Sequence, residues 1–215
     1  GSICGALYIL FSVFLTPLPS AILAIGARMM ISGAYHEDGL ADFFDGFGGG
    51  TSKEKILSIM KDSHIGTYGV IALIMTTLLM ISLLSSLTPL YGALMIISAD
   101  SWSKFCAGRI LSFLPYAREN NSSKNMAAYP KPDIKAFCIA LICGILPMSI
   151  ILCIYPMLAI CLSAGITASF LITFFLIHIM KKRIGGYTGD CCGATYIITE
   201  LTFCLFFIIS YFSTI

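Results

Sequence analysis

Charged residues are scarce in this sequence. Lys, Arg, Asp and Glu make up 11% of its 215 residues, whereas a soluble domain usually carries about 25%. The hydrophobic fraction is 58% and the mean hydropathy is +0.92. Several apolar runs also reach the roughly 20 residues that a helix needs to cross a bilayer. These features exclude an ordinary soluble domain and predict an all-α, polytopic integral membrane helical bundle.

The sequence also lacks the usual signs of a nucleic acid partner and of a disulfide framework. Its net charge is only +2, which is too small to indicate nucleic acid binding. Cys191 and Cys192 are adjacent rather than spaced as CxxC, so no structural zinc site is predicted. Most of the other cysteines lie within apolar runs, where they are interpreted as small hydrophobic residues: Cys4, Cys138, Cys143, Cys153, Cys161 and Cys204.

About seven apolar segments are expected to span the membrane, within one catalytic domain over residues 1–215. They are residues 3–15, 18–34, 65–87, 91–114, 136–154, 157–179 and 194–215. The connections near Pro17, Pro89 and Pro156 are short and uncharged. The other three are basic, with Lys53, Lys55 and Lys61; then Arg118, Lys124, Lys131 and Lys135; then Lys181, Lys182 and Arg183. Seven spans put all three basic loops on one side, which the positive-inside rule makes cytoplasmic.

An acidic, glycine-rich stretch interrupts the apolar pattern at residues 36–50. Asp38, Asp42 and Asp45 are spaced i, i+4, i+7, so on a helix their carboxylates lie on one face. Carboxylates stacked in this way repel one another, which predicts a bound cation. Oxygen-only ligands favour Mg²⁺ or Mn²⁺ over zinc. The three aspartates are therefore predicted metal ligands, and the alternative is a solvated loop that begins a helix.

A second glycine-rich run, residues 185–190, comes just before the last apolar segment. Its backbone N–H groups, at Gly186 and Gly189 among others, could cradle a phosphate, while Asp190 could complete the metal site. A flexible turn in which Asp190 caps the next helix explains the same residues.

Histidine and basic side chains near these motifs are further candidates. His36 and His64 flank the acidic stretch, and either could act as a general base or serve as a hydrogen-bonding loop residue. Lys61, Arg118 and residues 181–183 could bind phosphate groups. For most of these cations, positive-inside topology is a sufficient explanation.

Charged residues also occur inside apolar segments, where they are costly and usually paired or functional. Asp100 and Lys104 are one helical turn apart, which favours a mutual ion pair facing the bundle interior over direct substrate contact. Glu200 is expected to be neutral or paired with Arg109 or Lys104. Arg28, near the end of its segment, is expected to extend towards the interface.

Taken together, the motifs resemble those of the cobalamin synthase, or adenosylcobinamide-GDP ribazoletransferase, family. The resemblance rests on the His-x-Asp-Gly-Leu-Ala-Asp-x-x-Asp-Gly core at residues 36–46, with residues 59–69, 114–118 and 185–190. It implies an integral membrane, Mg²⁺-dependent enzyme that joins α-ribazole, or its 5′-phosphate, to adenosylcobinamide-GDP and releases GMP. The residues at motif positions are His36, Asp38, Asp42, Asp45, Lys61, Asp62 and Asp190.

The chemistry of such a transfer, taken by itself, predicts roles for these residues. Asp38, Asp42 and Asp45 would hold Mg²⁺ on the diphosphate, with Asp190 assisting from a facing loop. Lys61 or Arg118 would neutralise the departing GMP, Asp62 would help to bind substrate, and a carboxylate or His36 would take the hydroxyl proton. We expect the protein to lie in a bacterial or archaeal cytoplasmic membrane, with its site facing the cytoplasm. The protein could also form an oligomer.

The sequence departs from the family pattern at two points, and two other classes of membrane protein are alternatives to this family. The family's extreme N-terminal segment is expected to be missing, and residues 120–123 read Asn-Asn-Ser-Ser where members are often glycine-rich. One alternative is a CDP-alcohol phosphotransferase, although Asp38-Gly39-Leu40-Ala41 is followed by Asp42 rather than by Arg. The other is a transporter with Asp100, Lys104 and Glu200 as a relay, which would require repeat-related spans that the sequence does not show.

Overall fold

The computed structural model describes residues 1–118 and 131–214, so the central loop at residues 120–123 lies outside the described residues. In the described part, all named elements are helical, and the predicted all-α bundle is confirmed. The elements are α1 (Ser2–Ser12), α2 (Pro17–Ser32), α3 (Tyr35–Gly49), α4 (Lys53–Ile59), α5 (Thr67–Ser85), α6 (Pro89–Phe113), α7 (Ile134–Ile154), the 3-10 helix η2 (Pro156–Leu158), α8 (Ala159–Ile184) and α9 (Gly189–Thr214).

Proline and polar caps start several helices where the sequence predicts turns. Pro17, Pro89 and Pro156 lie in the first turns of α2, α6 and η2, where the missing N–H group would have had no helical partner. The side chains of Thr88 and Asp133 accept backbone hydrogen bonds at the starts of α6 and α7. Local sequence therefore fixes where these helices begin.

All seven predicted apolar segments fold as helices, but fewer are suited to cross a membrane alone. In the described residues, α5, α7, α9 and the continuous stretch Pro156–Ile184 are long and apolar enough. Helices α2 and α3 pass that test only as a bent pair, which gives four or five spans rather than about seven. Helix α1 is too short, and α6 carries Asp100, Lys104 and Arg109.

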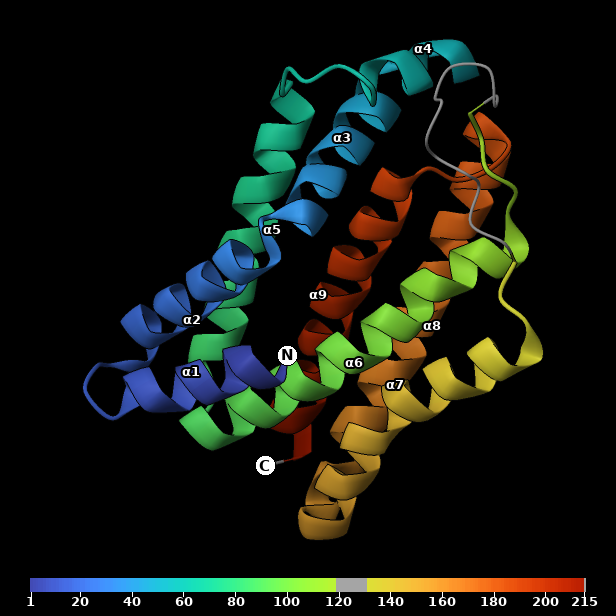
Figure 1. Cartoon of the computed structure of the whole chain (residues 1–215). Helices are drawn as coiled ribbons and strands as arrows, with labels where there is room; N and C mark the ends of the chain where they lie inside the picture. The colour runs from blue at the N-terminus through green and yellow to red at the C-terminus, as the bar shows by residue number, and fades with distance from the viewer. Residues whose placement is uncertain (119–130, 215) are drawn as a thin grey trace.

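The bend between α2 and α3 measures 89°. Gly33 and Ala34 both adopt left-handed backbone conformations there, with φ of 65° and 53°. An alanine rarely adopts this conformation, which costs a non-glycine residue about 1–2 kcal/mol. The bend turns α3 away from α2 and towards α4 (Figure 1), so the acidic stretch begins at a sharp corner of the chain.

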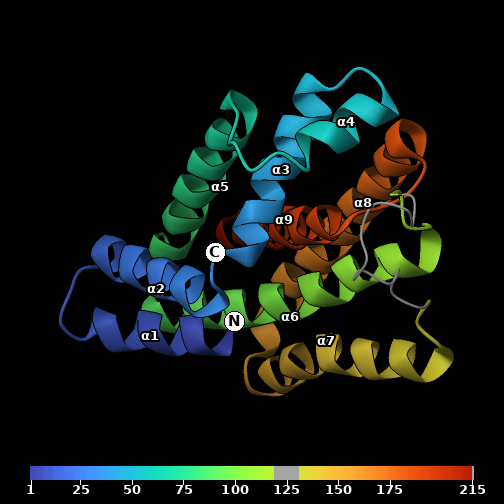
Figure 2. The same ribbon diagram turned by 45° about the horizontal axis from the view of Figure 1, so that its top comes forward.

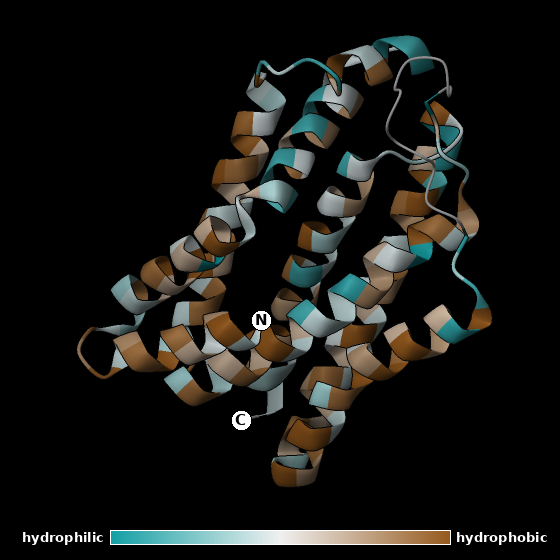
Figure 3. Cartoon of the chain, in the orientation of Figure 1, coloured by the Kyte–Doolittle hydropathy of each residue, from teal (hydrophilic) through white to brown (hydrophobic). Residues whose placement is uncertain are grey.

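Helix α9 occupies the centre of the molecule. It packs against α8, α3 and α6, and both ribbon views show it surrounded by the other helices (Figures 1 and 2). One buried cluster surrounds its C-terminal half and includes Tyr8, Phe203 and Phe207; a second, with Leu40, Ile56 and Met180, lies between α3, α4 and α8. Hydrophilic residues gather on α3 and α4, whereas α5, α7 and α8 are largely hydrophobic (Figure 3).

Candidate functional site

The acidic stretch folds as a helix, as predicted, and its three aspartates differ in exposure. On α3, Asp38 is exposed, Asp42 is half-buried and Asp45 is buried. This order follows the packing of α3, whose C-terminal half is covered by α4 and α5. The three carboxylates therefore do not share one environment, although they share one helix.

Glycines allow α3 and α9 to cross at very short range beside Asp38. A Cβ atom at Gly39 would lie 3.0 Å from the carbonyl oxygen of Asp190, and one at Gly193 would lie 3.3 Å from that of His36. Side chains at these two positions would push the helices apart. The crossing therefore brings the start of α9, with Asp190, against the acidic face of α3.

The two remaining motifs are joined by backbone hydrogen bonds. The N–H of Ala117 donates to the carbonyl of Tyr187, and the N–H of Tyr187 donates to that of Pro115, both at 2.9 Å. This short parallel bridge between Tyr116 and Tyr187 aligns the segment after α6 with the loop before α9. As a result, Arg118 comes to lie beside Asp190.

Arg118 links three parts of the chain. Its Nη2 donates to Asp190 Oδ2 and to the carbonyl of Met60, each at 3.3 Å. Thr188 Oγ1 also donates to Asp190 Oδ2, at 3.2 Å. Lys61 follows Met60 directly and is exposed, so a second cation lies one residue from the carbonyl that Arg118 contacts.

The charges around Asp42 are mostly negative. Asp190, Asp38 and Asp45 all act on its carboxylate, and Arg118 opposes them. Asp190 in turn interacts with Arg118 and Asp38. Among the described residues, carboxylates from α3 and α9 therefore act on one another, and the Arg118 guanidinium opposes them. This excess of negative charge favours binding of a cation.

Asp45 makes two backbone hydrogen bonds that the sequence did not predict. Its Oδ2 accepts the N–H of Gly66 at 2.7 Å, and its Oδ1 accepts the N–H of Gly69 at 2.9 Å. A Cβ atom at either glycine would lie 2.5 Å from the Asp45 carboxylate. Asp45 thus caps the N-terminus of α5, and both of its oxygens are engaged with the backbone.

No group of three or more His, Cys, Asp or Glu side chains in the described residues is arranged to hold a metal ion by itself. This does not conflict with Mg²⁺, which proteins commonly bind through one or two carboxylates together with substrate phosphates and water. The donor set of Asp38, Asp42 and Asp190 consists of hard oxygen ligands and fits that mode. Asp190, predicted to complete the metal site, therefore stays a candidate with Asp38 and Asp42, and the ligand role of Asp45 stays a prediction.

Asp62 and His64 pair with each other in the exposed loop before α5. The His64 Nδ1 atom lies 2.7 Å from Asp62 Oδ1. This hydrogen bond raises the pKa of His64 and lowers the pKa of Asp62. The pair explains both residues without a bound substrate, so the substrate-binding role predicted for Asp62 stays a prediction.

The second glycine-rich run is used mainly for backbone packing. Gly186 lies against the backbone of Pro115 and Ala117, where a Cβ atom would clash. The N–H of Tyr187 is already bonded to Pro115, and Gly189 begins α9. The turn explanation therefore accounts for Gly186, and a phosphate cradle there would lack the Tyr187 N–H.

His36 faces a different direction from the aspartates. Its half-buried ring lies 4.4 Å from the ring of Tyr196, centroid to centroid. Residues two apart on a helix point to different sides, so the ring is directed away from the face of Asp38 and Asp42. The predicted general-base role of His36 gains no support from this geometry.

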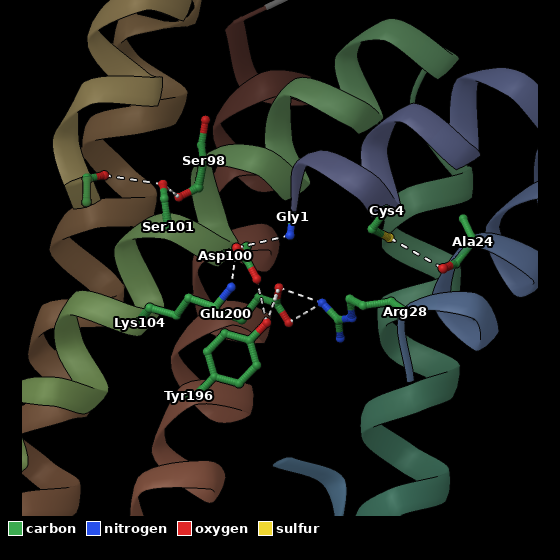
Figure 4. A network of polar contacts seen from close by, with 11 residues as sticks. Gly1, Cys4, Ala24, Arg28, Ser98, Asp100, Ser101, Lys104, Tyr196 and Glu200 are labelled. Atoms are coloured by element: carbon green, nitrogen blue, oxygen red, sulfur yellow. Dashed lines mark hydrogen bonds and ion pairs between the residues drawn. The ribbon is translucent and has the colours of Figure 1, made fainter. Parts of the chain in front are cut away.

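The sequence did not identify the main buried network (Figure 4). Arg28 Nη1 donates to both oxygens of Glu200, at 2.6 and 2.8 Å. The expected partners of Glu200, Arg109 and Lys104, are therefore wrong, and Arg28 turns inwards instead of reaching the interface. Arg109 instead packs over two aromatic rings. No local signal could have revealed a pair whose members are 172 residues apart.

The predicted ion pair of Asp100 and Lys104 is confirmed, but the Lys104 side chain is 56% exposed and does not face the bundle interior as expected. Lys104 Nζ donates to Asp100 Oδ2 at 2.9 Å, and the hydroxyl of Tyr196 donates to Asp100 Oδ1 at 2.7 Å. Arg183, a candidate phosphate ligand, has a structural role, because its guanidinium donates to the carbonyls of Phe47 and Gly50 at the end of α3.

The chain is similar to known proteins along most of its length. Residues 1–208 match the family model described as cobalamin-5-phosphate synthase. An adenosylcobinamide-GDP ribazoletransferase of Shewanella pealeana is 34% identical over 205 residues, which cover 94% of this chain and 77% of that protein. The Azorhizobium caulinodans protein of the same name is 39% identical over 189 residues, with 86% and 70% covered. No solved structure matches the chain.

Proposed function

Since this chain belongs to the cobalamin-5-phosphate synthase family, we propose that it is an adenosylcobinamide-GDP ribazoletransferase of the membrane. It joins α-ribazole, or its 5′-phosphate, to adenosylcobinamide-GDP and releases GMP, which completes the nucleotide loop of cobalamin. The family match lends no support to a CDP-alcohol phosphotransferase or to a transporter.

The convergence of Asp38, Asp42 and Asp190 with Arg118 is the observation that carries this proposal. Transfer to an alcohol from a diphosphate needs positioned charge more than covalent help from the protein. Asp42, with Asp38 or Asp190, would hold Mg²⁺ (or Mn²⁺), which supplies positive charge to the diphosphate oxygens when bound. Arg118 lies beside Asp190 and would neutralise the leaving phosphate.

The reaction is a substitution at phosphorus. A sugar hydroxyl oxygen of the acceptor forms a bond to the phosphorus on the cobinamide side. The bond from that phosphorus to the bridging oxygen breaks, and its electron pair leaves with GMP. The hydroxyl proton passes to a carboxylate, for which Asp38 is suited because it is exposed on the acidic face. Arg118, with Lys61 beside its loop, balances the charge that develops on GMP.

The site is proposed to face the cytoplasm. Helix α4, the C-terminal end of α8 and the start of α9 lie at one end of the molecule (Figure 1), and the cations Lys53, Lys181 and Lys182 lie on these elements. A positive excess on one side marks that side as cytoplasmic. Single cysteines at Ser52 and Lys182, in a cysteine-free background, should react only with a reagent on the cytoplasmic side, and one at Thr88 only from outside.

The direct test uses the full-length protein reconstituted into vesicles. We expect release of GMP from adenosylcobinamide-GDP only when α-ribazole or its phosphate and Mg²⁺ are present, with one corrinoid product formed for each GMP. EDTA should stop the reaction, and added Mg²⁺ should restore it. GMP release without the acceptor would indicate a hydrolase, and a complete lack of release would remove the proposal.

A further inference from the structure

The side chain of Arg109 on α6 is buried against α7, and the residue is 8% exposed. Its guanidinium lies between two aromatic rings. The Cζ atom is 4.9 Å from the ring centre of Phe105 and 4.6 Å from that of Phe137. A cation within about 6 Å of a ring centre is attracted by the ring. Phe105 comes from α6 and Phe137 from α7, so the two helices together hold the guanidinium in place.

This guanidinium has no hydrogen-bond acceptor in the described part of the chain. Arg109 takes part in none of the ion pairs found there, and its Nε atom is fully covered without a hydrogen bond. The two Nη atoms also lack a partner but are not fully covered. An unpaired charge in such a position is costly. The Nη groups are therefore open to an acceptor from outside the protein.

The guanidinium lies at the end of a helix that can cross the bilayer. Phe137 is in the first turn of α7, which is long and apolar enough to span the membrane. The first turn of such a helix lies near the boundary between the hydrocarbon core and the headgroups. Arg109 is also one turn before Phe113, the last residue of α6. Both helices thus place the guanidinium at the level of the lipid headgroups.

The surface around this guanidinium is apolar. Phe113 on α6 and Ile134 on α7 are exposed, and little of α7 is buried inside the molecule. Helix α7 packs beside α6 at the edge of the molecule and is largely hydrophobic (Figures 2 and 3). A bilayer covers such a surface with acyl chains. The acceptor must therefore carry a polar group next to hydrocarbon, as a phospholipid does.

The charge of Arg109 favours an anionic phospholipid over a neutral one. A guanidinium forms paired hydrogen bonds with phosphate oxygens. No carboxylate of the described residues pairs with Arg109, so the protein does not balance its charge there. A zwitterionic headgroup would bring its own ammonium group close to the guanidinium. Basic sites between membrane helices are known to bind anionic headgroups.

We propose that Arg109 binds the phosphate of an anionic phospholipid at the boundary between α6 and α7. Phe105 and Phe137 orient the guanidinium, and the acyl chains lie along α7. This lipid site uses no residue of the acidic cluster, so it goes beyond the proposed transfer reaction and does not depend on it. From this end of α6 the chain continues to Arg118, which lies beside Asp190.

Trp102 provides a direct readout, because it is the only tryptophan of the sequence. Its ring lies 5.1 Å from that of Phe105, centroid to centroid, and it precedes Arg109 by two helical turns. Phospholipids with brominated acyl chains quench tryptophan fluorescence when they lie close to the ring. Full-length protein with Trp102 as its only tryptophan is reconstituted into vesicles of neutral lipid. Brominated phosphatidylglycerol or brominated phosphatidylcholine then replaces a rising fraction of that lipid.

We expect phosphatidylglycerol to quench at about a fivefold lower fraction than phosphatidylcholine, the preference that one cation near the membrane surface supplies. Arg109→Gln should reduce this preference to less than about twofold, because the charge is lost. The matched control is Lys55→Gln on the exposed surface of α4, which removes one positive charge elsewhere and should keep the preference. Equal quenching by both lipids in the wild type would overturn the proposal, as would an unchanged preference in Arg109→Gln.

Two further measurements cover misfolding and the source of the phosphate. Quenching by phosphatidylcholine should be the same in Arg109→Gln and the wild type if the variant is folded. If it is not folded, Phe137→Leu decides: it keeps the charge but removes one ring, so the preference should fall, and an unchanged preference would contradict the site. Inorganic phosphate, compared with sodium chloride at equal ionic strength, should leave the preference intact. Its loss in phosphate alone would show that Arg109 binds a soluble anion instead of a lipid.

Discussion

The guanidinium of Arg118 lies 3.3 Å from the carboxylate of Asp190, although 72 residues separate the two in the sequence. The pair is held in place by the backbone bridge between the segment after α6 and the loop before α9. Arg118 also contacts the carbonyl of Met60. One side chain therefore joins the ends of α4 and α6 to the start of α9, next to the acidic face of α3.

Replacing Arg118 should lower turnover more than it lowers stability. We expect Arg118→Met to reduce kcat about a hundredfold, which corresponds to about 2.7 kcal/mol of transition-state stabilisation. The side chain is only partly buried, so the melting temperature should change little. Arg118→Lys keeps the charge but loses the forked geometry and should be intermediate. A variant with near-normal kcat would show that Arg118 does not act on the leaving group.

Asp42→Asn should affect metal use. Removing one carboxylate that balances a cation should weaken the response to Mg²⁺ and reduce activity about a hundredfold. Stability in EDTA should be unchanged or slightly higher, because repulsion from Asp38 and Asp190 is relieved. Activity measured against Mg²⁺ concentration, together with thermal unfolding in EDTA, checks both parts. An unchanged Mg²⁺ response would exclude Asp42 as a ligand.

Asp45→Ala, in contrast to Asp42→Asn, should lower stability and leave the response to Mg²⁺ unchanged. It leaves the N–H groups of Gly66 and Gly69 without their carboxylate acceptor, which should cost about 2 kcal/mol of stability. The activity that remains in the folded fraction should keep the Mg²⁺ dependence of the wild type. If the variant is stable but needs much more Mg²⁺, Asp45 is a metal ligand after all and the capping role is secondary.

The pair of Arg28 and Glu200 should show strong coupling. Glu200 is fully buried, so Glu200→Gln leaves the Arg28 guanidinium without a counter-charge and should cost about 3–5 kcal/mol. Combining it with Arg28→Met removes both charges and should recover most of that loss. Thermal unfolding of the two single variants and the double variant measures the coupling. Losses that simply add would mean that the two side chains do not interact.

The exposed pair of Asp62 and His64 should be visible in a pH titration. Asp62 raises the pKa of His64, so the pair persists below the usual pKa of histidine and is lost as pH rises through the raised value. At the acidic end it is lost as Asp62, whose pKa is lowered, becomes protonated. Nuclear magnetic resonance should report a His64 pKa above about 6.5, and Asp62→Asn should return it to that value.

Much of the fold follows from the sequence alone. Low charge and long apolar runs require helices in a bilayer, because backbone groups there must be bonded within the chain. Pro17, Pro89 and Pro156 mark helix starts, and the spacing of Asp38 and Asp42 places them on one helix face. The pairing of Asp100 with Lys104 was also predictable, because the two residues are one turn apart.

Only the tertiary structure decided which distant groups meet. The sequence presents Asp45 as the equal of Asp42, yet the packing of α5 against α3 gives its carboxylate to two backbone N–H groups. In the same way, the helix crossing at Gly39 brings Asp190 to the acidic face, and the packing of α2 against α1 and α5 leaves Arg28 within hydrogen-bond distance of Glu200. Local spacing determines what one helix presents. Contacts between helices depend on how their surfaces fit together, and no single segment contains that information.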